Sequence, residues 1–151
     1  APEDAEIVLS RILDAAALAI AWLPAMFAEG QTSAVDESRL RFAAAQHEII
    51  AILIAEGQYQ RAVEEFEKIL DLGFSGPQEE LVVRETWTVA KSLMDRGAYE
   101  QAHAVISAAL KSLQSDESQF ALLMLRGKAF KEQGKLREAL EAYRQAQSFQ
   151  Q

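Results

Sequence analysis

The sequence predicts an all-α fold built mainly from repeated helical hairpins, and three observations support this prediction. Alanine, a strong helix former, occurs 27 times, whereas Gly and Pro together occur only ten times in 151 residues. Apolar residues make up 50% of the chain and charged residues 25%, close to an average soluble domain, so general disorder is not expected. Three stretches share one pattern around a glycine, and no stretch is a candidate strand.

The first predicted element is an apolar helix over 4–28. Its apolar side chains do not keep to one face, which indicates burial on several sides. Residues 15–28 carry no charge but are fewer than the roughly 20 residues that span a bilayer, so we predict no membrane span. We expect the helix to cap the first hairpin, with self-association into a homodimer as the alternative. The residues assigned to self-association are Ile12, Ile20, Leu23 and Phe27.

Three segments then align without gaps on Gly57, Gly97 and Gly134. In each, Tyr or Leu follows the glycine after two residues, Ala after five and a large apolar residue after nine. Glycine ends a helix in the left-handed conformation, and the small Ala lets two helices approach closely. Ser115 or Asp116 is expected to cap the third hairpin. After a polar loop over 30–33, the pattern predicts helix pairs at 34–56 with 59–72, 77–96 with 99–113, and 117–133 with 136–148.

The spacing of these residues resembles the W-x2-L-G-x2-Y…A-x3-F pattern of the tetratricopeptide repeat family. The third copy matches best, with Leu123 in the Trp place followed by Arg126, Gly127, Phe130, Ala139 and Tyr143. Glycine spacings of 40 and 37 exceed the family period of 34, so the three repeats are divergent and lengthened. The resemblance implies a right-handed α-solenoid of three helix-turn-helix repeats with an extra N-terminal helix. A single domain over 1–151 would comprise the helix 4–28 and repeats at 34–72, 77–113 and 117–149.

The resemblance also implies a concave groove, lined by the first helix of each pair, that binds a peptide or a helix. The residues that it assigns to this groove are His47, Ile54, Arg84, Trp87, Lys91, Met94, Met124, Lys128 and Lys131. Trp87 is expected to face the groove, and a local helix rotation that returns it to the core is the alternative. Basic side chains beside an exposed indole would suit an acidic peptide with an apolar anchor.

Charge and composition exclude several classes of function. The net charge is −8, so nucleic acid is not an expected main partner. Residues 118–151 carry six basic and three acidic side chains, which would suit an acidic partner for that segment, and a basic helix face exposed to solvent is the alternative. Cysteine is absent, and His47 and Glu48 are not followed by the second His of a zinc-protease motif. We therefore expect no enzyme activity, no metal site and no cofactor.

The leading hypothesis for function is a non-catalytic protein–protein interaction module, acting as an adaptor or scaffold. One alternative is a structural self-assembly module that dimerises through the apolar N-terminal helix. Another is a regulatory fragment of a larger multidomain protein. A cytoplasmic location is expected, and an extracytoplasmic one after removal of a signal is the alternative.

Overall fold

The computed structural model describes residues 34–149, and this part of the chain consists of six α-helices and one 3-10 turn. The helices are α2 (Ala34–Ala55), α3 (Tyr59–Leu70), α4 (Glu79–Asp95), α5 (Tyr99–Ser112), α6 (Asp116–Glu132) and α7 (Leu136–Gln147), and the turn η1 (Gly76–Gln78) precedes α4. No strand lies within residues 34–149, so the all-α prediction is confirmed there. Each helix begins and ends within two residues of its predicted range. The helix expected over 4–28, with Ile12, Ile20, Leu23 and Phe27, lies outside the described residues.

The three predicted turn glycines follow α2, α4 and α6 in the left-handed conformation. The φ angles of Gly57, Gly97 and Gly134 are +79°, +74° and +79°. In the α4–α5 turn the amide of Gly97 donates to the carbonyl of Met94, and the next amide donates to the carbonyl of Leu93. Equivalent bonds close the other two turns, as in the Schellman motif. Glycine therefore ends each first helix and reverses the chain into the second.

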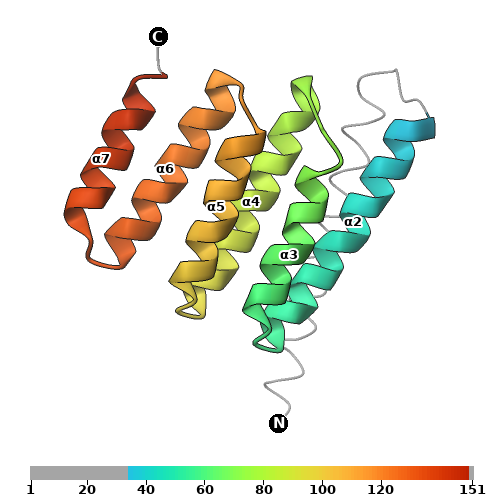
Figure 1. Ribbon diagram of the computed structural model, residues 1–151, viewed down its shortest axis with the longest axis horizontal. Helices are drawn as coiled ribbons and strands as arrows, with labels where there is room; N and C mark the ends of the chain where they lie inside the picture. The colour runs from blue at the N-terminus through green and yellow to red at the C-terminus, as the bar shows by residue number, and fades with distance from the viewer. Residues whose placement is uncertain (1–33, 150–151) are drawn as a thin grey trace.

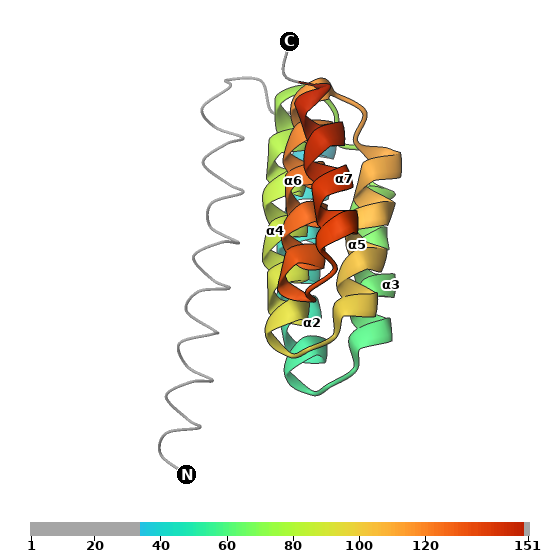
Figure 2. The ribbon, with the colours of Figure 1, turned by 90° about the vertical axis from the view of Figure 1, so that its left-hand side faces the viewer.

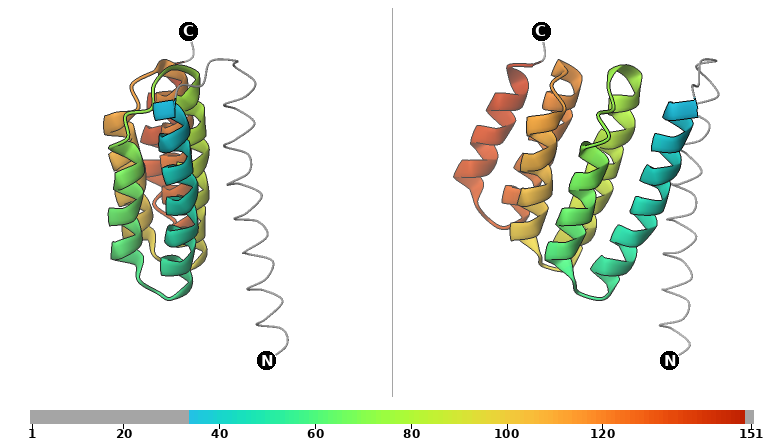
Figure 3. Two further views of the ribbon diagram at one scale, coloured as in Figure 1. Left: turned by 90° about the vertical axis from the view of Figure 1, so that its right-hand side faces the viewer. Right: turned by 45° about the vertical axis from the view of Figure 1, so that its right-hand side comes forward.

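The helices pack as hairpins that contact their neighbours in chain order. The pairs are α2 with α3, α4 with α5 and α6 with α7 (Figure 1). Between pairs, α2 contacts α4, α4 contacts α6, α3 contacts α5 and α5 contacts α6. Helices α2, α4 and α6 lie in one layer, and α3 and α5 lie in a second (Figures 2 and 3). Figure 2 also shows α7 displaced from the second layer towards α6.

A continuous apolar core fills the space between the helices from α2 to α6. Ala62, Ala102 and Ala139, each five residues after a turn glycine, are at most 3% exposed. Their small size lets the two helices of a pair approach closely, as the repeat pattern predicts. Phe66 and Ile106, each four residues further on, are fully buried and fill the space beyond the alanines.

Helices α6 and α7 also approach closely, at Gly127. A Cβ atom built at Gly127 would lie 2.5 Å from Cε1 of Tyr143, which is closer than real contacts allow. The ring of Tyr143 therefore packs directly over the backbone of α6, and this contact depends on the missing side chain of Gly127.

Ser115 caps α6, as predicted. Its Oγ accepts a hydrogen bond of 3.1 Å from the amide of Ser118, which satisfies one of the free donors in the first helical turn. The Ser115 hydroxyl also donates to Oε1 of Glu79 at 2.9 Å. The cap therefore links the start of α6 to the start of α4.

The large apolar side chains that remain exposed in residues 37–149 lie on the first and last of these helices. On α2, Phe42, Ile49 and Ile52 are 44%, 42% and 59% exposed, and on α7 Leu136 and Leu140 are 67% and 52% exposed. Interior helices have neighbours that cover such side chains, whereas the outer sides of α2 and α7 have none among the described residues.

Candidate interaction face on α4 and α6

Seven of the nine residues assigned to the groove lie on α4 and α6, two helices that contact each other. Six of the seven are exposed or half-buried, and they are Arg84, Trp87 and Lys91 on α4 and Met124, Lys128 and Lys131 on α6. Spacings of three and four residues place each trio on one side of its helix. Together they form what we term the α4–α6 face.

The other three assigned residues do not lie on an open surface, and their assignment to the groove is wrong. His47, Ile54 and Met94 are only 5%, 3% and 4% exposed. Counting helical turns gives the direction in which a side chain points around its own helix axis. It does not show where the neighbouring helices lie, and they decide whether that side chain is exposed. Because α2 packs against both α3 and α4, less of its surface is free than the resemblance implied. Helix α4, which carries Met94, is in turn packed against α2, α3, α5 and α6.

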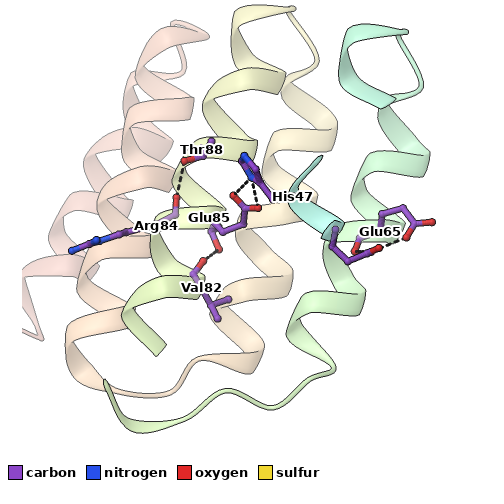
Figure 4. A network of polar contacts seen from close by, with 8 residues as sticks. His47, Glu65, Val82, Arg84, Glu85 and Thr88 are labelled. Atoms are coloured by element: carbon purple, nitrogen blue, oxygen red, sulfur yellow. Dashed lines mark hydrogen bonds and ion pairs between the residues drawn. The ribbon is translucent and has the colours of Figure 1, made fainter. Parts of the chain in front are cut away.

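His47 instead forms a buried ion pair with Glu85. Its Nδ1 lies 2.7 Å from both Oε1 and Oε2 of Glu85, which is 0% exposed (Figure 4). Burial lowers the pKa of His47, but the hydrogen bond and charge of Glu85, with the charge of Glu48, outweigh burial. The net effect raises the pKa of His47 above its ordinary value of 6.5. The pair joins α2 to α4 and is part of the structure that supports the face.

Trp87, the one tryptophan within residues 34–149, lies partly in the core and partly at the surface. Its side chain is half-buried and packs against the hydrophobic core. On its other side, Nζ of Lys128 lies 6.0 Å from the centroid of the ring, at the outer limit of a cation–π contact. The indole therefore connects α4 to α6 and still presents part of its surface to a ligand.

Four of the six residues of the α4–α6 face are basic and none is acidic, on a protein that is acidic overall. Arg84 pairs with Glu80 at 2.9 Å, but both side chains are highly exposed, so this ion pair adds little stability. Lys91 and Lys131 are exposed and form no ion pair with another described residue. Their charges are therefore available to a partner that carries carboxylates.

Sequence reasoning missed Glu85, the partner that removes His47 from the surface. The signal was a carboxylate on the same side of the helix as Val82, three residues before it, and Val89, four residues after it, which are both buried. A charged residue in such a position needs a buried partner, because an unpaired charge in a protein interior is very unfavourable. His47, on the helix packed against α4, is that partner.

Residues 34–149 contain no group of three or more His, Cys, Asp or Glu side chains arranged to hold a metal ion. Among those residues, every helix is too short or too polar to cross a bilayer. No protein-family model matches the chain, and a search of curated proteins finds no significant match.

Proposed function

We propose that this chain is a non-catalytic protein-interaction module that binds a peptide or a helix across the α4–α6 face. The observation that supports this proposal is the half-buried indole of Trp87, with Lys128 6.0 Å away and three further basic side chains on the same face. Tryptophan and arginine are enriched in protein interfaces, where partly buried aromatic side chains act as anchors.

The partner that fits this face is an acidic segment with at least one apolar side chain. Carboxylates would pair with Lys91, Lys128 or Lys131 and orient the segment, while burial of the apolar side chain against Trp87 would supply most of the affinity. The net charge of −8 repels an acidic segment from most of the protein, so the basic face also steers its approach.

We also propose that the six helices form a right-handed α-solenoid of three divergent tetratricopeptide-like repeats. Support comes from the order of contacts, in which each helix packs within its hairpin and against the next hairpin. The equivalent turns at Gly57, Gly97 and Gly134 add to it. In stacked repeats the first helices share one extended surface, which is suited to a peptide or a helix.

A peptide-library selection against the full chain tests the binding proposal. We expect enriched peptides to be acidic and to contain an apolar residue. Trp87→Ala should weaken their binding by about 30-fold, the effect of losing a hot-spot residue. Lys91→Glu should weaken it by about three- to fivefold at low salt, and less at high salt.

The matched control is Lys135→Glu, which makes the same charge change in the α6–α7 turn, at a residue that is not part of the face. Because Trp87 contacts the core, each variant is first compared with wild type by thermal unfolding. Peptides that bind wild type, Lys91→Glu and Lys135→Glu equally well would contradict the proposal.

Self-assembly is a second candidate function, favoured by the exposed apolar side chains of α2. Phe42, Ile49 and Ile52 recur at spacings of seven and three residues, which places them on one side of the helix. A second copy could bury this stripe. Light scattering over a range of protein concentrations tests this candidate, and a monomer at every concentration contradicts it.

A further inference from the structure

A depression of about 650 Å³ lies between α5, α6 and α7. Arg126 and Lys111 supply positive charge to its lining, and Leu110, Leu123 and Phe149 supply apolar surface. No Asp or Glu contributes to the lining. On α6, Arg126 is two residues from Met124 and two residues from Lys128. A separation of two residues corresponds to a rotation of about 200° around the helix axis. The depression and the α4–α6 face therefore lie on opposite sides of α6.

Arg126 occupies a helical position that is apolar in the other two hairpins. The residue eight positions before the turn glycine is Ile49 in the first hairpin, Val89 in the second and Arg126 in the third. Val89 is 2% exposed and belongs to the core. The tetratricopeptide pattern has leucine at the same place. A charged residue there departs from the apolar character of this position in the other two hairpins, and such departures are characteristic of functional sites.

The arrangement of the helices opens the space above Arg126. Helix α3 packs against α5, whereas α7 packs mainly on α6 and lies out of line with α3 and α5 (Figure 2). Helices α5 and α7 make no contact comparable to the one between α3 and α5. The side of α6 that carries Leu123 and Arg126 is therefore left uncovered.

The guanidinium of Arg126 has donors available for a ligand. Its Nη2 donates to Oγ of Ser107 at 3.0 Å, and Arg126 forms no ion pair with a carboxylate of residues 37–149. Burial lowers the pKa of Arg126, although an arginine side chain stays protonated at neutral pH. A guanidinium carries five N–H donors, enough to keep the bond to Ser107 and still bind a carboxylate through two parallel hydrogen bonds.

We propose that this depression is a second binding site, for a small organic carboxylate that carries an apolar chain. Arg126 binds the carboxylate, Lys111 adds a second positive charge at the exposed edge, and the apolar chain packs on Leu123 and Phe149. The volume is within the range of roughly 300–1,000 Å³ that is common for small-molecule sites. The apolar part of the lining favours such a ligand over inorganic phosphate, which has no group to bury there.

NMR titration of the full chain tests the site with three probes. Hexanoate supplies a carboxylate and an apolar chain, hexanamide has the same chain without the charge, and inorganic phosphate has charge without a chain. We expect millimolar hexanoate to shift the amides around Arg126 and Phe149, with much smaller effects from the other two probes. Equal effects of hexanamide or phosphate, or no effect of hexanoate, would overturn the proposal.

Two variants and one control localise the binding. Arg126→Gln should weaken hexanoate binding by at least about tenfold, as expected for loss of a hydrogen-bonded charge. Lys111→Gln changes an exposed side chain that is not expected to affect folding, and should weaken binding by a few fold. Lys135→Gln removes the same charge from the α6–α7 turn, at a residue that belongs neither to the depression nor to the α4–α6 face, and should have no effect. Hexanoate binding that is lost equally in Lys135→Gln, or unchanged in Lys111→Gln and Arg126→Gln, would contradict the assignment.

Discussion

Replacing Glu85 by Gln should reverse the pH dependence of stability near neutral pH. In the native protein His47 and Glu85 are 5% and 0% exposed, with Nδ1 of His47 2.7 Å from both carboxylate oxygens. Gln keeps the size of the side chain but removes the charge. We expect Glu85→Gln to lower the free energy of unfolding by about 1.5–3 kcal/mol, the contribution of a hydrogen bond to a charged group. Glu85→Ala, which leaves His47 buried without a partner, should lower it by about 3–5 kcal/mol.

The direction of the pH effect follows from the raised pKa of His47. Above the ordinary value of 6.5, the native state keeps its proton while the unfolded state loses it. The contribution of this pair to the free energy of unfolding is therefore fully present below pH 6.5 and is lost as pH rises through the native pKa of His47. The free energy of unfolding falls by at most about 1.4 kcal/mol per pH unit in that range. In Glu85→Gln, burial becomes the dominant influence and lowers the pKa of His47. That variant should instead lose stability as pH falls through the range below 6.5.

Urea unfolding of wild type and Glu85→Gln at several pH values between about 5.5 and 8.5 measures this difference. Subtracting one curve from the other cancels the contribution of titrating groups that both proteins share. The double variant His47→Leu with Glu85→Leu is a useful control, because removing both partners should restore much of the stability lost in either single variant. Parallel pH profiles for wild type and Glu85→Gln would refute the assignment of a charged His47–Glu85 pair.

Three further substitutions test the local structure by chemical or thermal unfolding. Gly127→Ala should lower the free energy of unfolding by about 1–3 kcal/mol, because the new methyl group would collide with Tyr143, and Tyr143→Leu in the same chain should recover part of the loss. Gly97→Ala should lower the free energy of unfolding by about 1–2 kcal/mol through backbone strain alone, since no atom lies within 4 Å of the new Cβ. Gly97→Asn should lower it by less, because Asn tolerates the left-handed conformation better than Ala. Ser115→Ala should lower the free energy of unfolding by about 1 kcal/mol by removing the cap of α6. An unchanged free energy of unfolding would show that the hydrogen bond between Ser115 and Ser118 does not stabilise the fold.

The helices could be predicted from the sequence because local residues determine where they begin and end. Gly57, Gly97 and Gly134 adopt the left-handed conformation that the repeat pattern requires, and Ser115 supplies the expected cap. The small residues where two helices meet were also visible as a repeated spacing. These features depend on a residue and its near neighbours along the chain, so one sequence is enough to identify them.

The candidate site could be predicted only in part, because side-chain exposure depends on contacts between distant helices. Arg84, Lys91 and Lys131 are exposed as expected, but His47 is buried by a partner 38 residues away. No periodicity links His47 to Glu85. Arg126 was noted only as part of the repeat pattern, since its exposure to a depression depends on where α7 lies relative to α5.

The most direct test of the proposed function is to map a selected acidic peptide onto the full chain by NMR chemical shifts. Binding at the α4–α6 face predicts that the largest shifts occur around Trp87, including its indole N–H, and around Lys128. At a low peptide concentration these shifts should be about three- to fivefold smaller in Lys91→Glu than in wild type. Shifts confined to other helices, or an unchanged indole N–H signal of Trp87 at saturation, would contradict the account.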